Sequence, residues 1–103
     1  MILSSSGQNI YPEEIEAKLN NLPYVVESLI ISKNKRLIAL VYPDYDAVKA
    51  AGLSPEDLKK VMNKNKQTLN EMVASFEKIA EVQLYENEFE KTPKKSIKRF
   101  LYT

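Results

Sequence analysis

The strongest constraint on the fold is a pair of apolar runs joined by a short polar turn. Residues 24–32 are rich in β-branched side chains, and their apolar residues fall on both faces of an extended chain. Residues 36–42 repeat this pattern, and Lys33-Asn34-Lys35 between them is a polar turn whose Asn tolerates the left-handed conformation. Pro43 ends the second run. These segments are predicted to form a hairpin at the centre of a sheet, covered at least partly on both faces.

A helix is predicted before this hairpin, starting at Pro12. Proline suits the first helical position because its missing N–H costs nothing there and its φ is already helical. One stripe of the helix is apolar at helical spacing: Ile15, Leu19 and Leu22. Three acidic residues are interpreted as charges that favour a helix start and not as a catalytic acid pair: Glu13, Glu14 and Glu16.

After the hairpin the pattern becomes helical. Residues 44–51 predict a short helix closed by Gly52. Residues 54–76 begin like a capping box and continue with apolar side chains at three- and four-residue spacing, which predicts a helix. Because residues 63–67 are polar, this stretch could be one continuous helix or two shorter ones. Residues 81–85 predict a third strand. This order predicts an α+β fold, a small three-stranded, mostly antiparallel sheet with packed helices.

Composition limits the function classes. A length of 103 residues with 44% apolar content fits a single domain over residues 1–103. The sequence has no cysteine, which excludes thiol catalysis and fits a reducing, cytoplasmic location, and it has no histidine, the commonest general base and metal ligand. It also has no apolar run of the roughly 20 residues that span a bilayer. Without a phosphate loop, an acidic metal site or a nucleophile–base pair, the chain alone is expected to be inactive and to bind no metal or cofactor.

Positive charge gathers in residues 87–103, called the closing segment below. Formal net charge is only +1, yet residues 91–103 hold five basic residues and no acidic one. The segment is predicted to be an extended, largely exposed strand or loop with a short structured end, anchored intermittently by Phe89, Ile97, Phe100 and Leu101. Its charge is predicted to project from Lys91, Lys94, Lys95, Lys98 and Arg99. Because few aromatic residues are interleaved with these cations, no nucleic acid partner is expected.

Residues 1–11 form an opening segment, and the small-polar stretch around Gly7 at its centre is called the opening turn below. Gly7 is one of only two glycines in the chain. A plain hairpin turn would explain it, whereas a functional glycine turn would let a ligand approach the backbone closely.

Both regions carry motifs that resemble one family. The stretch Gly-Gln-Asn-Ile-Tyr-Pro-Glu-Glu-Ile-Glu at residues 7–16 is similar to the motif that opens the small C-terminal domain of adenylate-forming enzymes. These enzymes include acyl-CoA synthetases, the adenylation domains of peptide synthetases, and luciferases. Residues 89–99 resemble the closing motif of the same domain. The resemblance covers essentially the whole chain and is closest to the long-chain fatty acyl-CoA synthetases.

The resemblance implies a mobile C-terminal lid domain of a long-chain fatty acid–CoA ligase. Such a domain closes over the active site for acyl adenylation and rotates to serve thioester formation with CoA. The implied partners are a large N-terminal adenylation domain of the same chain, the fatty acid, and ATP/Mg and CoA in the full-length enzyme. An alternative from a different class is a free-standing, non-catalytic domain that binds a protein partner or an anionic ligand through its basic tail.

The resemblance also assigns candidate site residues. Gly7 and Gln8 would line the tunnel for the pantetheine arm of CoA. The family's catalytic lysine position in the closing motif is occupied here by Ser96. Lys95 adjoins that position, and Lys94 shares the face of Ser96 in an extended strand, so either lysine, with a reach of about 6 Å, could substitute. The other possibility is that adenylation is impaired.

Overall fold

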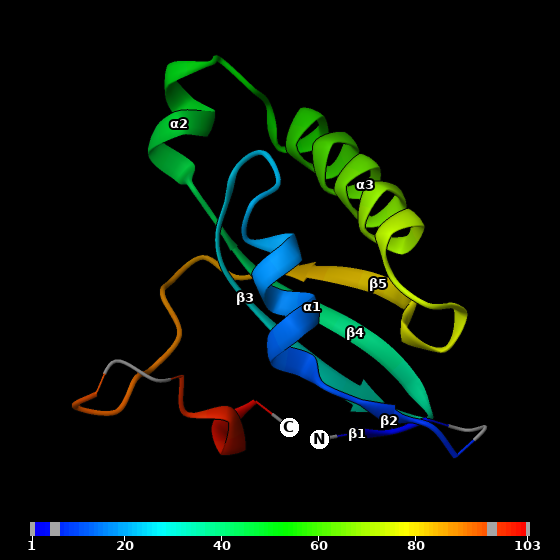
Figure 1. Cartoon of the computed structure of the whole chain (residues 1–103). Coiled ribbons are helices and arrows are strands. Elements are labelled where there is room, and N and C mark those ends of the chain that lie inside the picture. The colour runs from blue at the N-terminus through cyan, green and yellow to red at the C-terminus, as the bar shows by residue number, and fades with distance from the viewer. Residues whose placement is uncertain (1, 5–6, 95–96, 103) are drawn as a thin grey trace.

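A central sheet organises the computed structural model, which describes residues 2–4, 7–94 and 97–102. Its strands are β3 (Val25–Lys33), β4 (Arg36–Pro43) and β5 (Ile79–Leu84), in the order β3-β4-β5 (Figure 1). β3 and β4 are antiparallel, whereas β4 and β5 are parallel. The predicted third strand therefore joins the hairpin in the parallel direction. A parallel neighbour needs a long crossover, which the two helices between β4 and β5 provide.

The predicted hairpin is confirmed. Lys33 pairs with Arg36, so the connection has two residues. Asn34 and Lys35 adopt φ values of 53° and 63°, as a type I′ turn requires at both central positions.

The described residues form three α-helices: α1 (Pro12–Leu19), α2 (Tyr45–Ala50) and α3 (Pro55–Met72), of which α1 and α3 pack against the sheet. α3 is continuous across residues 63–67, where the sequence left open one helix or two. Asn65 explains the continuity, because its side chain is only 3% exposed and its Nδ2 donates to the Pro23 carbonyl oxygen at 2.8 Å. A polar residue on the buried face is tolerated when its hydrogen bond is made.

The sheet is buried on both faces, as the hairpin pattern predicted. Alternating side chains of each strand point to opposite faces. On one face the sheet packs against α1 and α3. The first core between them includes Ile15, Leu19, Ile30, Ala39, Val41 and Leu69. The other face carries a second core of Leu29, Ile31, Ile38, Leu40 and Phe89, against which Tyr42, Tyr85, Ile97 and Tyr102 pack. The closing segment therefore completes a core of the fold.

Two short strands lie next to the sheet and lead into α1. β1 (Ile2–Leu3) and β2 (Asn9–Ile10) pair antiparallel and flank the opening turn. Ile10 is buried in the first core and Pro12 opens α1, so the turn is tied to the body of the domain. Short 3₁₀ helices, η1 (Ser75–Glu77) and η2 (Arg99–Leu101), precede β5 and end the closing segment.

α3 begins with the predicted capping box, which yields a pH-dependent stability. The Asp57 backbone N–H donates to Ser54 Oγ and the Ser54 N–H donates to Asp57 Oδ2, both at 3.1 Å. Hydrogen bonding from the backbone of Ser54 lowers the pKa of Asp57. The stabilisation is therefore present above the pKa that Asp57 has in the unfolded chain. It is lost as pH falls through the lower pKa of Asp57 in the folded chain.

Urea unfolding of the 103-residue chain and its Asp57→Asn variant checks this interpretation. The free energy of unfolding should be higher for the native chain at neutral pH, and the difference should disappear as pH falls through the lowered pKa of Asp57 in the folded chain. A difference that stays constant with pH would show that the carboxylate charge has no role in the cap.

Candidate functional site

The opening turn exposes its backbone on a fixed support. The Ser4 N–H donates to the Gln8 carbonyl oxygen at 2.8 Å, and the Gly7 N–H donates to the Ser4 carbonyl oxygen at 3.0 Å. Gly7 has φ +85°, a conformation that favours glycine, and a Cβ built there would meet no atom of the described residues within 4 Å other than its chain neighbours. Gly7 and Gln8 are both exposed. The turn thus offers an open side to which a ligand could come close.

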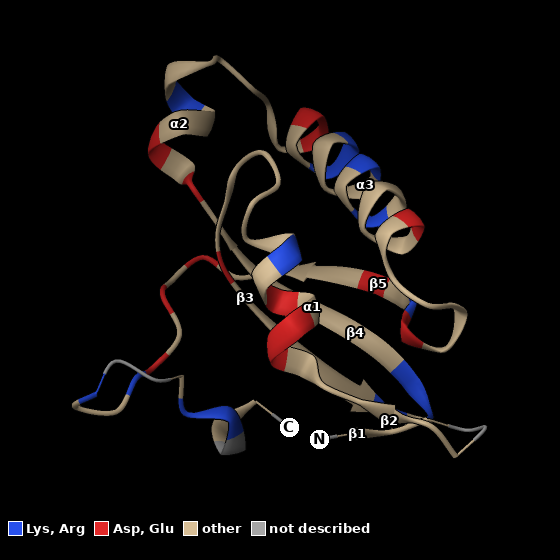
Figure 2. Ribbon diagram, in the orientation of Figure 1, with Lys and Arg blue, Asp and Glu red and all other residues tan. Residues whose placement is uncertain are grey.

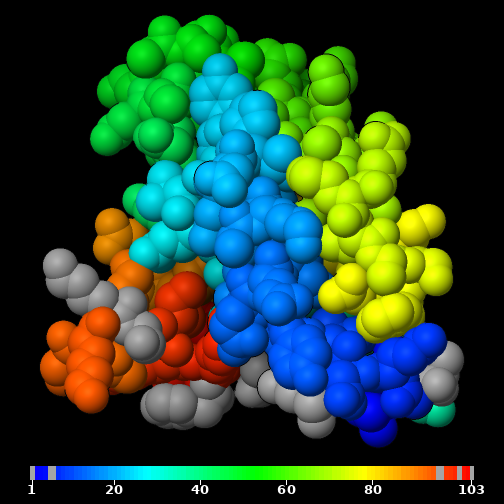
Figure 3. Space-filling view, in the orientation of Figure 1, coloured from blue at the N-terminus to red at the C-terminus, as the bar shows by residue number. Residues whose placement is uncertain are grey.

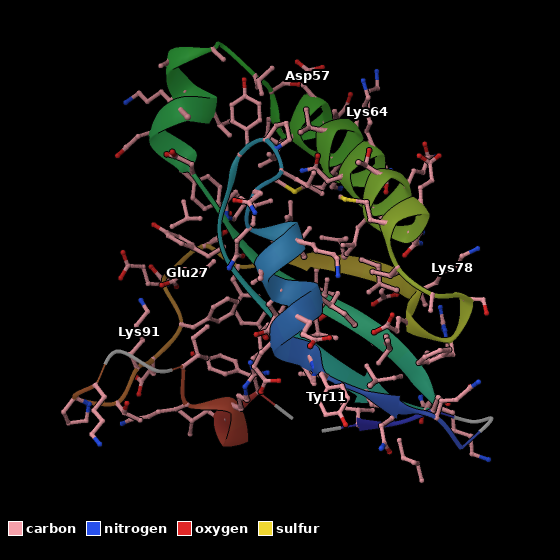
Figure 4. All side chains as sticks on the ribbon, viewed as in Figure 1. Tyr11, Glu27, Asp57, Lys64, Lys78 and Lys91 are labelled. Atoms are coloured by element: carbon pink, nitrogen blue, oxygen red, sulfur yellow. The ribbon has the colours of Figure 1, made fainter. Side chains whose placement is uncertain are left out.

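A depression of about 420 Å³ lies beside the opening turn. Ser4 and Gln8 line it from the turn, Lys35 and Arg36 from the β3–β4 connection, and Lys78 from the residue before β5. Figure 2 shows basic segments at the start of β4 and before β5, and Figure 4 labels Lys78 there. None of the described residues that line the depression is acidic. Such a surface favours an anion over a cation.

The closing segment folds back on itself. Lys91 and Ile97 form an antiparallel bridge, and the Lys98 N–H donates to the Glu90 carbonyl oxygen at 2.8 Å. These contacts close the base of a loop at residues 91–97, called the closing loop below. Of the predicted strand or loop, the segment is a loop with a closed base, and the short 3₁₀ helix η2 forms its structured end.

Aromatic residues attach this base to the second core. Phe89 is 2% exposed, and its ring centroid lies 5.2 Å from that of Tyr85 and 5.1 Å from that of Tyr102. The Tyr102 hydroxyl oxygen accepts a hydrogen bond of 2.8 Å from the Glu90 N–H. Leu101 is 51% exposed, so its predicted role as an anchor is wrong.

Arg99 joins the closing loop to α1 through a buried carboxylate. Glu16 is 7% exposed, and its Oε2 accepts hydrogen bonds from the Ile30 N–H at 2.7 Å and from Arg99 Nη1 at 2.8 Å. Arg99 Nη2 donates to Glu16 Oε1, which completes a bidentate pair. The hydrogen bond to Glu16 raises the pKa of Arg99. Glu13 Oε1 lies 3.7 Å from Arg99 Nη2. A favourable charge at a helix start does not account for Glu16, whose carboxylate binds β3 and the closing segment.

Lys91 forms the second ion pair of the closing loop, with Glu27 on β3. Figure 4 shows these two side chains pointing toward one another. Glu88 Oε2 lies 3.5 Å from Lys91 Nζ, and hydrogen bonding to Glu27 raises the pKa of Lys91. The prediction that Lys91 and Arg99 project their charge into solvent is therefore wrong for both residues. Each neutralises an acidic side chain of the folded body.

The predicted catalytic lysines belong to the closing loop. Lys94 is exposed. Lys95 and Ser96 lie outside the described residues, as does the side chain of Phe100.

The opening turn and the closing loop are not brought together. In Figure 1 they extend from opposite sides of the molecule, and Figure 3 shows the orange and red atoms of the closing segment packed beside the blue atoms of α1. Both are attached to α1, the turn through β2 and the loop through the Glu16–Arg99 pair. The domain therefore carries two separate exposed surfaces, both connected to α1.

Sequence reasoning missed the partners that build these surfaces. Glu16 and Arg99 are 83 residues apart in the chain, and no spacing pattern links such positions. The same holds for Lys35, Arg36 and Lys78, which gather around the depression only because β4 and β5 are neighbours.

Two further features of residues 2–4, 7–94 and 97–102 bear on ligands. Among these residues, no group of three acidic side chains is placed to hold a metal ion. No helix in this part of the chain combines the length and apolar character needed to cross a bilayer.

Solved structures of adenylate-forming enzymes share the fold. The adenylation domain of a carboxylate reductase from Mycobacterium chelonae matches with TM-score 0.82 and 17% identity, over 97% of this chain and 17% of that chain. An acyl-CoA synthetase from Brucella canis has TM-score 0.71 and 23% identity, and a fatty acyl CoA synthetase from Mycobacterium tuberculosis has 0.62 and 23%. Each of these two matches covers 98% of this chain and 18% of the other. The chain thus spans less than a fifth of the length of these structures.

Sequence comparison identifies the family. No curated protein sequence matches the chain. The sequence profile described as the AMP-binding enzyme C-terminal domain matches residues 1–102. This match agrees with the resemblance of the two motifs and with the shared fold. The chain therefore belongs to the family of AMP-binding enzyme C-terminal domains.

Proposed function

We propose that the chain is the mobile C-terminal domain of a long-chain fatty acid–CoA ligase and acts with a large N-terminal adenylation domain of the same protein. The whole enzyme would convert a fatty acid, ATP with Mg²⁺ and CoA into acyl-CoA, AMP and pyrophosphate. Membership of the family supports ATP-dependent adenylation. The structural likeness to acyl-CoA synthetases supports a CoA ligase.

The observation that carries the proposal is the separation of two exposed surfaces on one domain. The opening turn exposes a glycine backbone beside a basic depression, and the closing loop presents lysine at another side (Figure 1). An active site on a second domain could meet only one of these surfaces at a time. Two successive half-reactions, with a rotation of the domain between them, would use both.

The closing loop would serve adenylation. The fatty carboxylate attacks the α-phosphorus of ATP, a P–O bond forms, and pyrophosphate leaves with the electrons of the bond that breaks. Negative charge gathers at the reacting phosphoryl group, and a positioned ammonium offsets it in a site that excludes water. We assign this role to Lys95, next to the family's position at Ser96, with Lys94 as the second candidate.

The opening turn would serve thioester formation. The CoA thiol gives up its proton, its sulfur forms a C–S bond with the acyl carbonyl carbon of the adenylate, and AMP leaves with the electrons of the C–O bond that breaks. The pantetheine arm would pass the open side of Gly7 and Gln8, where a Cβ built on Gly7 meets no atom of the described residues within 4 Å beyond its chain neighbours. Lys35, Arg36 and Lys78 line the adjoining depression and would attract the phosphates of CoA.

The free-standing alternative has less support from the charges of the closing segment. Two of its four described basic residues, Lys91 and Arg99, are bound to acidic side chains of the same domain. A tail that recruits an anionic partner would be expected to leave its cations available.

Pyrophosphate exchange tests the proposed function. The full-length enzyme should exchange labelled pyrophosphate into ATP with long-chain fatty acids and should form acyl-CoA when CoA is added. The 103-residue chain alone should give no exchange above a control without protein. Exchange by the isolated chain would contradict the proposal, and so would a full-length protein that activates no fatty acid of any length.

A further inference from the structure

The carboxylate of Glu16 connects three parts of the domain. It stands on α1, accepts the N–H of Ile30 at 2.7 Å from β3, and binds the guanidinium of Arg99 at the end of the closing loop. The Ile30 bond leaves the carboxylate little freedom to turn. Its two oxygens therefore present a fixed edge to the planar fork of Arg99, which fits a carboxylate in one orientation.

Stability alone is a poor explanation for such a pair. A buried ion pair often contributes no more than a pair of apolar side chains of similar size, because removing both charges from water costs about as much as their attraction returns. Beyond attraction, a bidentate pair fixes the relative orientation of the two segments that carry it. Here those segments are α1 and the end of the closing loop.

Arg99 follows the closing loop directly. The Arg99 N–H donates to the Ile97 carbonyl oxygen at 2.9 Å, and the neighbouring Lys98 N–H closes the loop base at the Glu90 carbonyl oxygen. On the other arm, Lys91 is held by Glu27. The loop thus leaves the body between two ion pairs. Glu16 is the more buried of the two carboxylates, with a side chain 9% exposed against 17% for Glu27, whereas Arg99 is more exposed than Lys91, at 34% against 26%.

We infer that Glu16 and Arg99 are positioning residues for adenylation, which hold the base of the closing loop so that its lysine side meets the reacting phosphate. The inference rests on the proposed function. It predicts that loss of the pair slows acyl-adenylate formation and spares thioester formation, which uses the opening turn. A displacement of about 1 Å is enough to cost on the order of a hundredfold in rate.

The test separates positioning from stability by a double variant of the full-length enzyme. Arg99→Met leaves the buried carboxylate of Glu16 without its cation and should lower the thermal midpoint. Glu16→Gln combined with Arg99→Met removes both charges, while the Gln amide oxygen can still accept the Ile30 N–H, so the midpoint should recover. Acyl-adenylate formation should nevertheless stay about tenfold to a hundredfold slow in both variants. Thioester formation from supplied acyl-adenylate should change less than about threefold.

Lys49→Met provides a matched control, because Lys49 is an exposed cation on α2 remote from these contacts. It should change neither half-reaction. A double variant that recovers both its midpoint and its adenylation rate would overturn the inference, since the pair would then be structural only.

Hydrogen exchange in the 103-residue chain tests the inference without any catalysis. In the double variant, the Lys98 amide at the loop base should exchange at least about tenfold faster, while the Ile30 amide keeps its protection. Unchanged protection of the Lys98 amide would overturn the inference even if the enzyme is active. An enzyme that adenylates no fatty acid would instead overturn the proposed function, and the exchange result would still decide whether Glu16 and Arg99 hold the loop base.

Discussion

Phe89→Ala is expected to lower the free energy of unfolding of the 103-residue chain by about 3–5 kcal/mol. Phe89 is 2% exposed, lies at the centre of the second core, and contacts the rings of Tyr85 and Tyr102. Removing its ring opens a cavity between the sheet and the closing segment, and the surroundings can refill it only in part. Chemical denaturation followed by far-UV circular dichroism measures the loss.

Two variants show whether the loss comes from this cavity. Phe89→Leu keeps much of the side-chain volume and should cost less than about 1.5 kcal/mol. Leu101→Ala removes a side chain that is 51% exposed and should stay within about 0.5 kcal/mol of the native chain. Equal losses in Phe89→Ala and Leu101→Ala would mean that the closing segment does not complete the second core.

The second large effect is expected in catalysis. In the full-length enzyme, alanine at the responsible lysine should slow acyl-adenylate formation about a hundredfold, as expected when one charge contact worth about 3 kcal/mol in the transition state is lost. Thioester formation from supplied acyl-adenylate should change far less. Lys95→Ala and Lys94→Ala are made separately, and we expect the selective loss in Lys95→Ala. If neither variant slows adenylation more than a few fold, the closing loop has no catalytic lysine at these positions.

Gly7→Ala should give the opposite selectivity. A Cβ at Gly7 would meet no atom of the described residues within 4 Å other than its chain neighbours, although φ +85° is unfavourable for alanine. The added methyl group would therefore intrude mainly on a ligand that approaches the turn, so thioester formation should slow while adenylation is spared. Single-turnover measurements of each half-reaction distinguish the two patterns.

Local patterns predicted much of the fold. The hairpin, the capping box at Ser54 and the closure of α2 at Gly52 each depend on neighbouring residues, and all are present. The parallel pairing of β5 was not predicted, because strand direction depends on the crossover through α2 and α3 and on no local signal. The continuity of α3 depends on Asn65 finding the Pro23 carbonyl 42 residues away.

The candidate site divides in the same way. Gly7 drew attention because a glycine before a helix start is a local signal, and the residue has a positive φ, whereas its role toward CoA stays a prediction. The ion pairs of Arg99 and Lys91 were missed, because a basic residue is predicted to be exposed when its acidic partner is not known. Glu16 was misinterpreted for the same reason, because the N–H that it accepts lies on another element.

The arrangement of the second core has a consequence during synthesis. Leu29, Ile31, Ile38 and Leu40 are translated long before the aromatic residues that cover them, Phe89 and Tyr102. While the ribosome adds the intervening residues, this side of the hairpin stays apolar and uncovered even when α1 and α3 have packed on the other side. A nascent or prematurely terminated chain would thus expose an apolar sheet surface that chaperones and other copies of the chain can bind. The closing segment protects the molecule from aggregation only once it has been made.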